Sequence, residues 1–227
     1  MISEFRNALI VAAHPDDEVL GVGGTIPRLK SLGARVTVLI VTDGSTAQYP
    51  DDSETLQRKI QQARDANEVL GVDQLVQWDC PDMRLDQVDH CLLNERLSSF
   101  IGEGGFDVVF CQNGDDVNLD HQVLHRSVLV ATRPFPGQPV KAVLSYWVNS
   151  STEWGGRSQA TVFCPNLYVD IAETVERKLA AMERYVDELR DYPHPRSLQA
   201  IRLRAAVTGN EVGIEFAEAF KVLLCRV

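Results

Sequence analysis

The sequence predicts one α/β domain, with a mostly parallel sheet flanked by helices and a β-rich C-terminal extension. In the first half of the chain, short continuous apolar runs alternate with longer segments of helical periodicity, a pattern typical of strands and crossover helices in a parallel sheet. Of the 227 residues, 44% are hydrophobic and 24% charged, ordinary values for a globular protein. No repeat, low-complexity tract or long linker divides the chain, so residues 1–227 are expected to form a single domain.

The predicted strands are short runs of apolar residues. Residues 8–13 and 36–41 are continuously apolar, as expected for strands that helices cover on both faces. The other strand-like segments are residues 75–78, 107–111, 140–148 and 160–163. The last two follow the alternating half of the chain, and they predict an antiparallel extension of the sheet.

The predicted helices show apolar residues at intervals of three or four, and several are followed by glycine. Residues 54–70 carry such a stripe, and Gly71 follows where a left-handed helix cap is expected. Gly33 stands in the same position after a shorter helix. The predicted helices are residues 27–32, 54–70, 92–101, 120–132 and 171–189.

Charge and cysteine usage narrow the range of partners. The chain carries 22 Lys and Arg against 32 Asp and Glu, a net charge of −10, so nucleic acids and anionic membranes are poor partners and a small molecule is favoured. No apolar stretch approaches the roughly 18 residues of a membrane span, and the N-terminus has no export signal. The five cysteines are odd in number and widely spaced, as in reduced packing residues. The expected compartment is the cytoplasm.

The sequence His14-Pro-Asp-Asp-Glu18 directly follows the first predicted strand and carries the strongest chemical signal. Ligands bind at the carboxyl ends of the strands in open α/β sheets. Three adjacent carboxylates in such a crevice are destabilised unless a cation compensates them. His14 and Asp17 are three residues apart, so one turn directs both side chains to the same point. An imidazole with a carboxylate suits zinc or another divalent transition metal.

A third metal ligand has to come from elsewhere in the chain. His121 follows the fourth predicted strand, whose loop opens onto the same sheet edge, and it is the preferred third ligand. His125, four residues later, shares a helix face with His121 and remains the alternative. Three protein ligands with an open fourth position are the arrangement of a catalytic zinc site.

Two aspartates beside the expected ligands have candidate roles in catalysis. Asp16 lies between two ligands, next to the expected position of a metal-activated water, and is predicted to be the general base. Asp120 precedes His121 and either orients a ligand or the substrate, or acts as a helix N-cap.

These motifs resemble the PIG-L or LmbE-like family of zinc-dependent N-acetyl-sugar deacetylases. The resemblance is carried by the sequence AHPDDE at residues 13–18 with the glycines that follow it, by NLDH at residues 118–121, and by the layout of most of the chain. It implies a Rossmann-like α/β fold, zinc held by His14, Asp17 and His121, and Asp16 as base. It also implies an N-acetylated sugar or sugar conjugate as substrate, and acetate and a free amine as products. Members of this family often assemble, so the resemblance leaves a homo-oligomer open.

One position departs from the family pattern. The second motif often reads His-x-Asp-His, but residue 118 is asparagine here. An amide donates a hydrogen bond but carries no proton near neutrality. We therefore expect Asn118 to hold the oxyanion and Asp16 to make both proton transfers.

Three further residues are candidates for substrate binding. Trp147 is suited to stack on a sugar face, and Arg58 and Arg196 to contact sugar hydroxyls or a diphosphate. A core role for the tryptophan and a solvated surface role for the arginines are the competing interpretations. Two alternative functions also remain: a metal-containing carbohydrate-binding protein without turnover, which the asparagine keeps open, and a hydrolase of a different amide.

Overall fold

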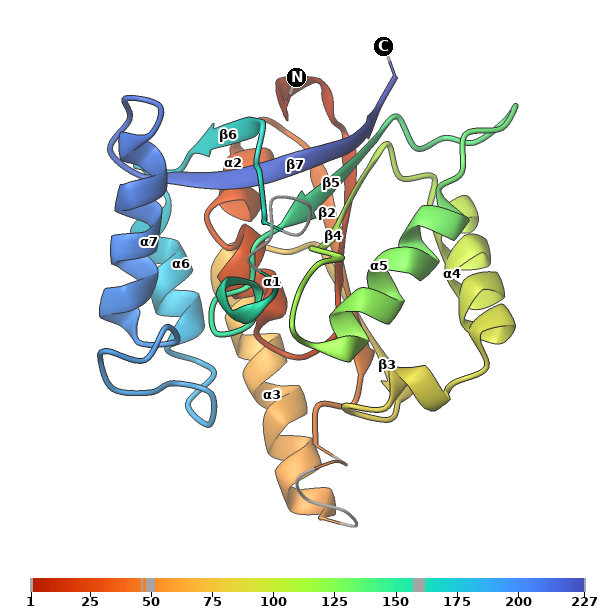
Figure 1. Cartoon of the computed structure of the whole chain (residues 1–227), viewed down its shortest axis with the longest axis horizontal. Helices are drawn as coiled ribbons and strands as arrows, with labels where there is room; N and C mark the ends of the chain where they lie inside the picture. Colours follow the sequence, from red (N-terminus) through yellow and green to blue (C-terminus); the bar gives the residue numbers. More distant parts are fainter. Residues whose placement is uncertain (1, 46, 48–51, 157–161, 227) are drawn as a thin grey trace.

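The computed structural model describes residues 2–45, 47, 52–156 and 162–226, which form a seven-stranded mixed sheet between two layers of helices (Figure 1). The strand order is β3-β2-β1-β4-β5-β7-β6, and the first five strands of this order are parallel. Strand β7 pairs antiparallel with both β5 and β6. The strands are β1 Asn7–Ala12, β2 Arg35–Thr42, β3 Gln74–Cys80, β4 Val108–Gln112, β5 Ala142–Tyr146, β6 Leu167–Asp170 and β7 Ala217–Cys225. The predicted α/β class is therefore confirmed.

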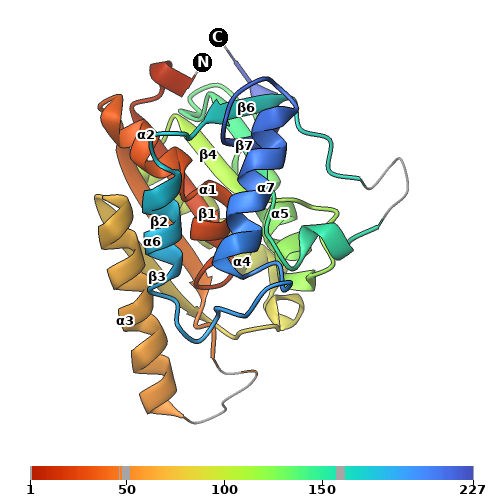
Figure 2. The same ribbon diagram turned by 90° about the vertical axis from the view of Figure 1, so that its left-hand side faces the viewer.

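Two hydrophobic cores lie on the two faces of the sheet. Side chains of β1 alternate between them, with Ile10 in one core and Leu9 in the other. Helices α1, α2, α3, α6 and α7 cover the first face, and α4 and α5 cover the second (Figure 2). The α-helices are α1 Asp17–Val22, α2 Thr25–Ser31, α3 Ser53–Leu70, α4 His90–Gly104, α5 Leu119–Ala131, α6 Val175–Met182 and α7 Leu198–Asn210; 3-10 turns are η1 Ile2–Glu4, η2 Leu85–Gln87 and η3 Thr152–Trp154.

The ends of α3 show how local sequence sets the boundaries of a helix. Asp52 accepts hydrogen bonds from the backbone N–H groups of Glu54 and Thr55 at its N-terminus. Gly71 ends it in the left-handed conformation, at φ 79°, as the sequence predicts. Gly33 closes α2 in the same way, at φ 82°. None of the described helices is long and apolar enough to cross a membrane.

The C-terminal half differs most from the prediction. The segment at residues 140–148 forms a single strand parallel to β4, and the antiparallel extension comes from β6 and β7, which the sequence pattern did not reveal. The predicted strand at residues 160–163 falls partly outside the described residues, and its last two residues are not in a strand. Helix α7 was also missed.

The predicted helix at residues 171–189 is correct only over Val175–Met182. Beyond it, the Tyr185 ring turns inward and its hydroxyl donates to buried Glu18 at 2.6 Å, whereas Val186 is 62% exposed. The apolar residues that predicted one long helical stripe therefore do not share one buried face: some point into the core and others are exposed. The packing role predicted for the cysteines fits buried Cys80 and Cys111 and is wrong for the other three, which are exposed.

Candidate functional site

A cavity of about 220 Å³ lies where the loops after the parallel strands meet. The loops after β1, β3, β4 and β5 each contribute to its walls, as expected for the carboxyl edge of such a sheet. Residues from the segment between α6 and α7 close its remaining side. The wall residues that concern the chemistry are His14, Asp16, Asp17, Asn118, His121 and Ser151.

The carboxylates of residues 16–18, in the turn after β1, lie in different environments. Asp16 has a positive φ of 112°, which is unusual for a residue with a side chain, and its backbone N–H donates to Glu18 Oε2 at 3.2 Å. The other Glu18 oxygen accepts from the Tyr185 hydroxyl at 2.6 Å and from Asn67 Nδ2 at 2.9 Å. Burial raises the pKa of Glu18 to about 7. Glu18 is thus a buried support for the backbone that presents Asp16.

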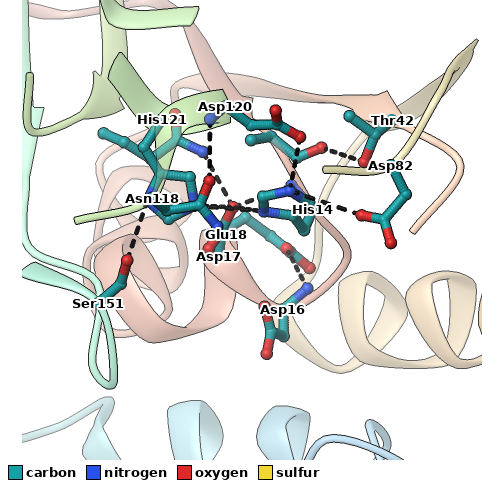
Figure 3. Close-up of polar contacts among 12 residues, drawn as sticks. His14, Asp16, Asp17, Glu18, Thr42, Asp82, Asn118, Asp120, His121 and Ser151 are labelled. Atoms are coloured by element: carbon teal, nitrogen blue, oxygen red, sulfur yellow. Dashed lines mark hydrogen bonds and ion pairs between the residues drawn. The ribbon is translucent and has the colours of Figure 1, made fainter. Parts of the chain in front are cut away.

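Three side chains converge in a triangle of donor atoms (Figure 3). His14 Nδ1 lies 3.2 Å from His121 Nε2, and each of these nitrogens lies 3.3 Å from Asp17 Oδ2. Bonds of about 2.0–2.1 Å in a tetrahedral zinc site place neighbouring nitrogen and oxygen ligands about 3.3 Å apart. The spacing and the donor types therefore fit one tetrahedral metal ion with its fourth position open to the cavity.

The outer nitrogen of each imidazole faces a carboxylate. His14 Nε2 lies 3.1 Å from Asp120 Oδ2 and 3.6 Å from Asp82 Oδ1, and His121 Nδ1 lies 3.2 Å from Asp116 Oδ2. Carboxylates in this position hold the proton on the outer nitrogen and leave the inner one free to bind a metal. His14, Asp82 and Asp120 form a second group of metal-binding residue types, on the outer nitrogen of His14.

Neighbouring carboxylates raise the pKa of both imidazoles. Burial opposes the charged form of His14, but hydrogen bonds to Asp120 and Asp17 outweigh burial and raise its pKa well above the ordinary value. Burial is likewise outweighed at His121 by the charge of Asp17 and a hydrogen bond to Asp116, and the pKa rises to about 9. Without a metal, His121 is therefore largely protonated at neutral pH.

Asp16 lies beside this triangle and lines the cavity. Burial raises the pKa of its carboxyl well above the usual range, and the charges of Asp17 and Glu188 add to the shift. Arg196 opposes the shift, with Nη1 at 3.4 Å from Asp16 Oδ2. A carboxyl with a raised pKa at the edge of a metal site is suited to take up and return a proton.

Asn118, and not Asp120, is the N-cap of α5. Its Oδ1 accepts from the Asp120 backbone N–H at 2.9 Å, and its Nδ2 lies 3.5 Å from Met83 Sδ at the cavity wall. The cap fixes the amide orientation, so the N–H₂ end remains the one that can face a ligand. Asp120 instead bridges His14 and the backbone N–H of Leu85, the latter at 2.9 Å.

The structure brings together some of the sequence-predicted residues and separates others. His125 is turned away, with Nδ1 at 2.8 Å from the Gln112 carbonyl. Of the two candidates for the third ligand, His121 is therefore the one in the triangle. Arg196 lines the cavity, but Arg58 is paired with Asp187 at 2.8 Å and lies outside it. Trp147 lies in a neighbouring small cavity, under the Arg204 guanidinium at 3.8 Å from the ring centre.

Several residues of the site gave no clear signal in the sequence. Asp116 holds His121 and accepts hydrogen bonds from the hydroxyls of Ser151 and Thr152. Its place in an acidic loop after a strand is the one hint that the sequence offers. Lys59 and Glu188 reach the cavity from a helix and from an irregular segment, where no motif marks them.

Comparisons with known proteins identify a matching family and several relatives. The family model described as PIG-L: GlcNAc-PI de-N-acetylase matches residues 9–132, which include every residue of the donor triangle. An uncharacterized deacetylase, YaiS of Escherichia coli, is 25% identical over 191 residues, covering 79% of this chain and 90% of the relative. A probable N-acetyl-alpha-D-glucosaminyl L-malate deacetylase 2 of Bacillus cereus is 24% identical over 184 residues, covering 78% and 81%.

Among solved structures, N,N'-diacetylchitobiose deacetylase from Pyrococcus horikoshii has a similar fold. It superposes with a TM-score of 0.78 over 98% of this chain and 85% of its own, at 21% identity. At that identity the likeness concerns the fold alone. It extends over nearly the whole chain, including the C-terminal strands that follow the family match.

Proposed function

The chain belongs to the PIG-L (GlcNAc-PI de-N-acetylase) family, and from that premise we propose that it is a zinc-dependent hydrolase that deacetylates an N-acetylated amino sugar or a conjugate of one. Relatives in this family are deacetylases of N-acetylated sugars. The observation that carries the proposal is the donor triangle of His14, Asp17 and His121 with a cavity-lining carboxylate, Asp16, beside it.

The residues of the chain divide the work of amide hydrolysis. A zinc ion held by the triangle would polarise the acetamide carbonyl and acidify a water molecule. The Asp16 carboxylate takes a proton from a water molecule as the water oxygen attacks the carbonyl carbon. It returns this proton to the amide nitrogen as the C–N bond breaks. The Asn118 amide donates a hydrogen bond to the oxygen that becomes negative. Acetate and a free amine result.

The residues around Asp16 favour this role. Burial raises its pKa and so makes the carboxylate a stronger base, and Arg196 opposes the shift and stays close enough to orient the carboxylate. Of the three residues expected to bind substrate, Arg196 alone lines the cavity, so it is the one retained in the proposed site.

Acetate release from N-acetylated sugars tests the proposal. Zinc-loaded protein should release acetate from at least one acetamido sugar, and a chelator should abolish the release. Asp16→Asn should lower kcat by about 10²- to 10⁴-fold while zinc content stays at one per chain, because the variant lacks the proton acceptor but keeps all three ligands. Full activity of this variant would contradict the role of Asp16. Sugar binding without acetate release by the zinc-loaded wild type would favour the carbohydrate-binding alternative.

A further inference from the structure

The size of the cavity limits how much of a substrate it can enclose. At about 220 Å³ it is smaller than the roughly 300–1,000 Å³ typical of ligand pockets, so one acetamido sugar ring fills it. Whatever is attached to that sugar has to lie at the mouth. This argument rests on the proposed deacetylase function, and the residues at the mouth then determine which conjugates are accepted.

An exposed tryptophan lies next to two segments that contribute to the cavity wall. Trp154 is 51% exposed, and its backbone N–H donates to the carbonyl of cavity-lining Ser151 at 3.1 Å. Its ring meets His194 edge-on, with 6.3 Å between ring centres, and His194 Nδ1 accepts from the backbone N–H of cavity-lining Arg196. The Trp154 backbone thus contacts one segment that contributes to the cavity wall, and its ring contacts the other.

The turn that carries Trp154 is held against the opposite loop. A Cβ atom on Gly155 would lie 2.3 Å from the Asp115 carbonyl oxygen, so the backbone packs directly on the loop that leads to Asn118. Close backbone packing fixes the position of the indole relative to the cavity. The exposed ring is thus presented by a rigid support.

Other exposed apolar side chains belong to the cavity wall or adjoin one of its residues in sequence. Met83 lines the cavity and is 53% exposed. Val117 and Leu119, on either side of cavity-lining Asn118, are 54% and 48% exposed. Single exposed apolar residues are ordinary, but a group of them around the mouth of a site is typical of a binding surface.

The cations of the cavity are already paired with carboxylates. Lys59 Nζ lies 2.6 Å from the Gly44 carbonyl and 2.9 Å from Glu188 Oε1. Arg196 Nη1 lies 2.6 Å from Glu188 Oε2 and 3.4 Å from Asp16 Oδ2. A phosphate entering here would compete with these carboxylates for both cations, in a chain of net charge −10.

We propose that the mouth is a subsite for an uncharged ring attached to the acetamido sugar, with Trp154 as its stacking surface and Met83 as a flexible apolar wall. The substrates are accordingly ring glycosides, and phosphate-bearing conjugates such as nucleoside diphosphate sugars are disfavoured. The ring is a second sugar or an aromatic group, since both present a flat apolar face.

Steady-state kinetics on four compounds test the proposal: N-acetylglucosamine, N,N'-diacetylchitobiose, 4-nitrophenyl N-acetyl-β-D-glucosaminide and UDP-N-acetylglucosamine. The two ring glycosides should exceed the free sugar in kcat/KM by about tenfold, mainly through KM, and the nucleotide sugar should fall below both. The better of the two glycosides identifies the second ring as a sugar or an aromatic group. Trp154→Ala should remove the advantage and leave kcat/KM for the free sugar unchanged, and Trp154→Phe should retain most of it.

A control variant and four contrary outcomes make the test decisive. Phe135→Ala alters an equally exposed aromatic, 55% exposed, in the loop after α5, and should change nothing. Equal kcat/KM for free and conjugated sugars, or a preference for the nucleotide sugar, would overturn the subsite and leave the deacetylase function standing. An equal loss on all compounds with Trp154→Ala would show a structural role instead. Acetate release from none of the four would overturn the deacetylase function and the subsite together.

Discussion

Zinc binding to the metal-free protein should weaken steeply as the pH falls from about 9 to 7, because a proton occupies the site. Burial disfavours a charged His121, but the charge of Asp17 and a hydrogen bond to Asp116 outweigh burial and raise its pKa to about 9. Only a neutral imidazole binds a metal. At pH 7, two units below that pKa, the proton weakens binding about 100-fold, or about 2.7 kcal/mol. His14, whose pKa is also raised, adds to the effect.

The same proton affects the stability of the metal-free fold in a defined direction. Because the pKa of His121 in the fold lies above its ordinary value of 6.5, the stabilisation is fully present below pH 6.5 and is lost as the pH rises through about 9. Zinc reverses this dependence, since it binds the deprotonated ring. The zinc-bound protein should therefore gain stability over the metal-free form as the pH rises.

Competition with a fluorescent chelator, repeated between about pH 7 and pH 8.5, measures the expected dependence. The zinc Kd should change by at least tenfold per pH unit, and calorimetry in two buffers of different ionisation enthalpy should show release of at least one proton per ion. His125→Ala serves as the matched control and should show the same slope, because His125 is turned away from the triangle and its pKa is lowered. A Kd constant within threefold over this range would refute the assignment of His121 as a protonated ligand.

Two further variants test the surroundings of the site. Asp120→Asn should lower zinc affinity by about 10- to 100-fold in chelator competition, because the carboxylate that holds the outer nitrogen of His14 is lost; unchanged affinity would refute that role. Glu218→Gln should lower the free energy of unfolding in urea by about 3–5 kcal/mol, because buried Lys178 loses its ion pair. The exposed Glu176→Gln is its control and should cost little, and equal losses in the two variants would contradict the argument.

The first half of the chain could be predicted from sequence because its buried strands are continuous runs of apolar residues. Strand β1 contributes side chains to both cores, so all of its residues after Asn7 are apolar, and most residues of β2 are apolar as well. Once the four strands of the first half are inferred to be parallel, their carboxyl ends share one edge. That rule alone brings the loop of His14 and the loop of His121 together across more than one hundred residues.

The second half could not be predicted in the same way, because its patterns are ambiguous. Helix α7 has Ile201 and Ala205 buried but Leu203 and Val207 exposed, so apolar residues occur on both of its sides and no single stripe marks it. The choice between His121 and His125 was also undetermined by spacing. It is decided by the Gln112 carbonyl at the end of β4, a backbone partner that no side-chain motif encodes.

The positions of the residues around the donor triangle are harder to predict from sequence than the triangle itself. The triangle needs a short turn and one helix start, and both are encoded locally by AHPDDE and NLDH. Glu188 and Arg196 come instead from the irregular segment between α6 and α7, and Trp154 comes from the 3-10 turn η3. Only tertiary contacts place them: the ion pairs around Asp16 and the ring contact with His194. A site that requires fixed distances between donor atoms can therefore be recognised from sequence motifs. Selection among substrate conjugates depends instead on loops, whose positions follow from tertiary packing. The preference for uncharged ring glycosides is accordingly a property to test on this chain itself.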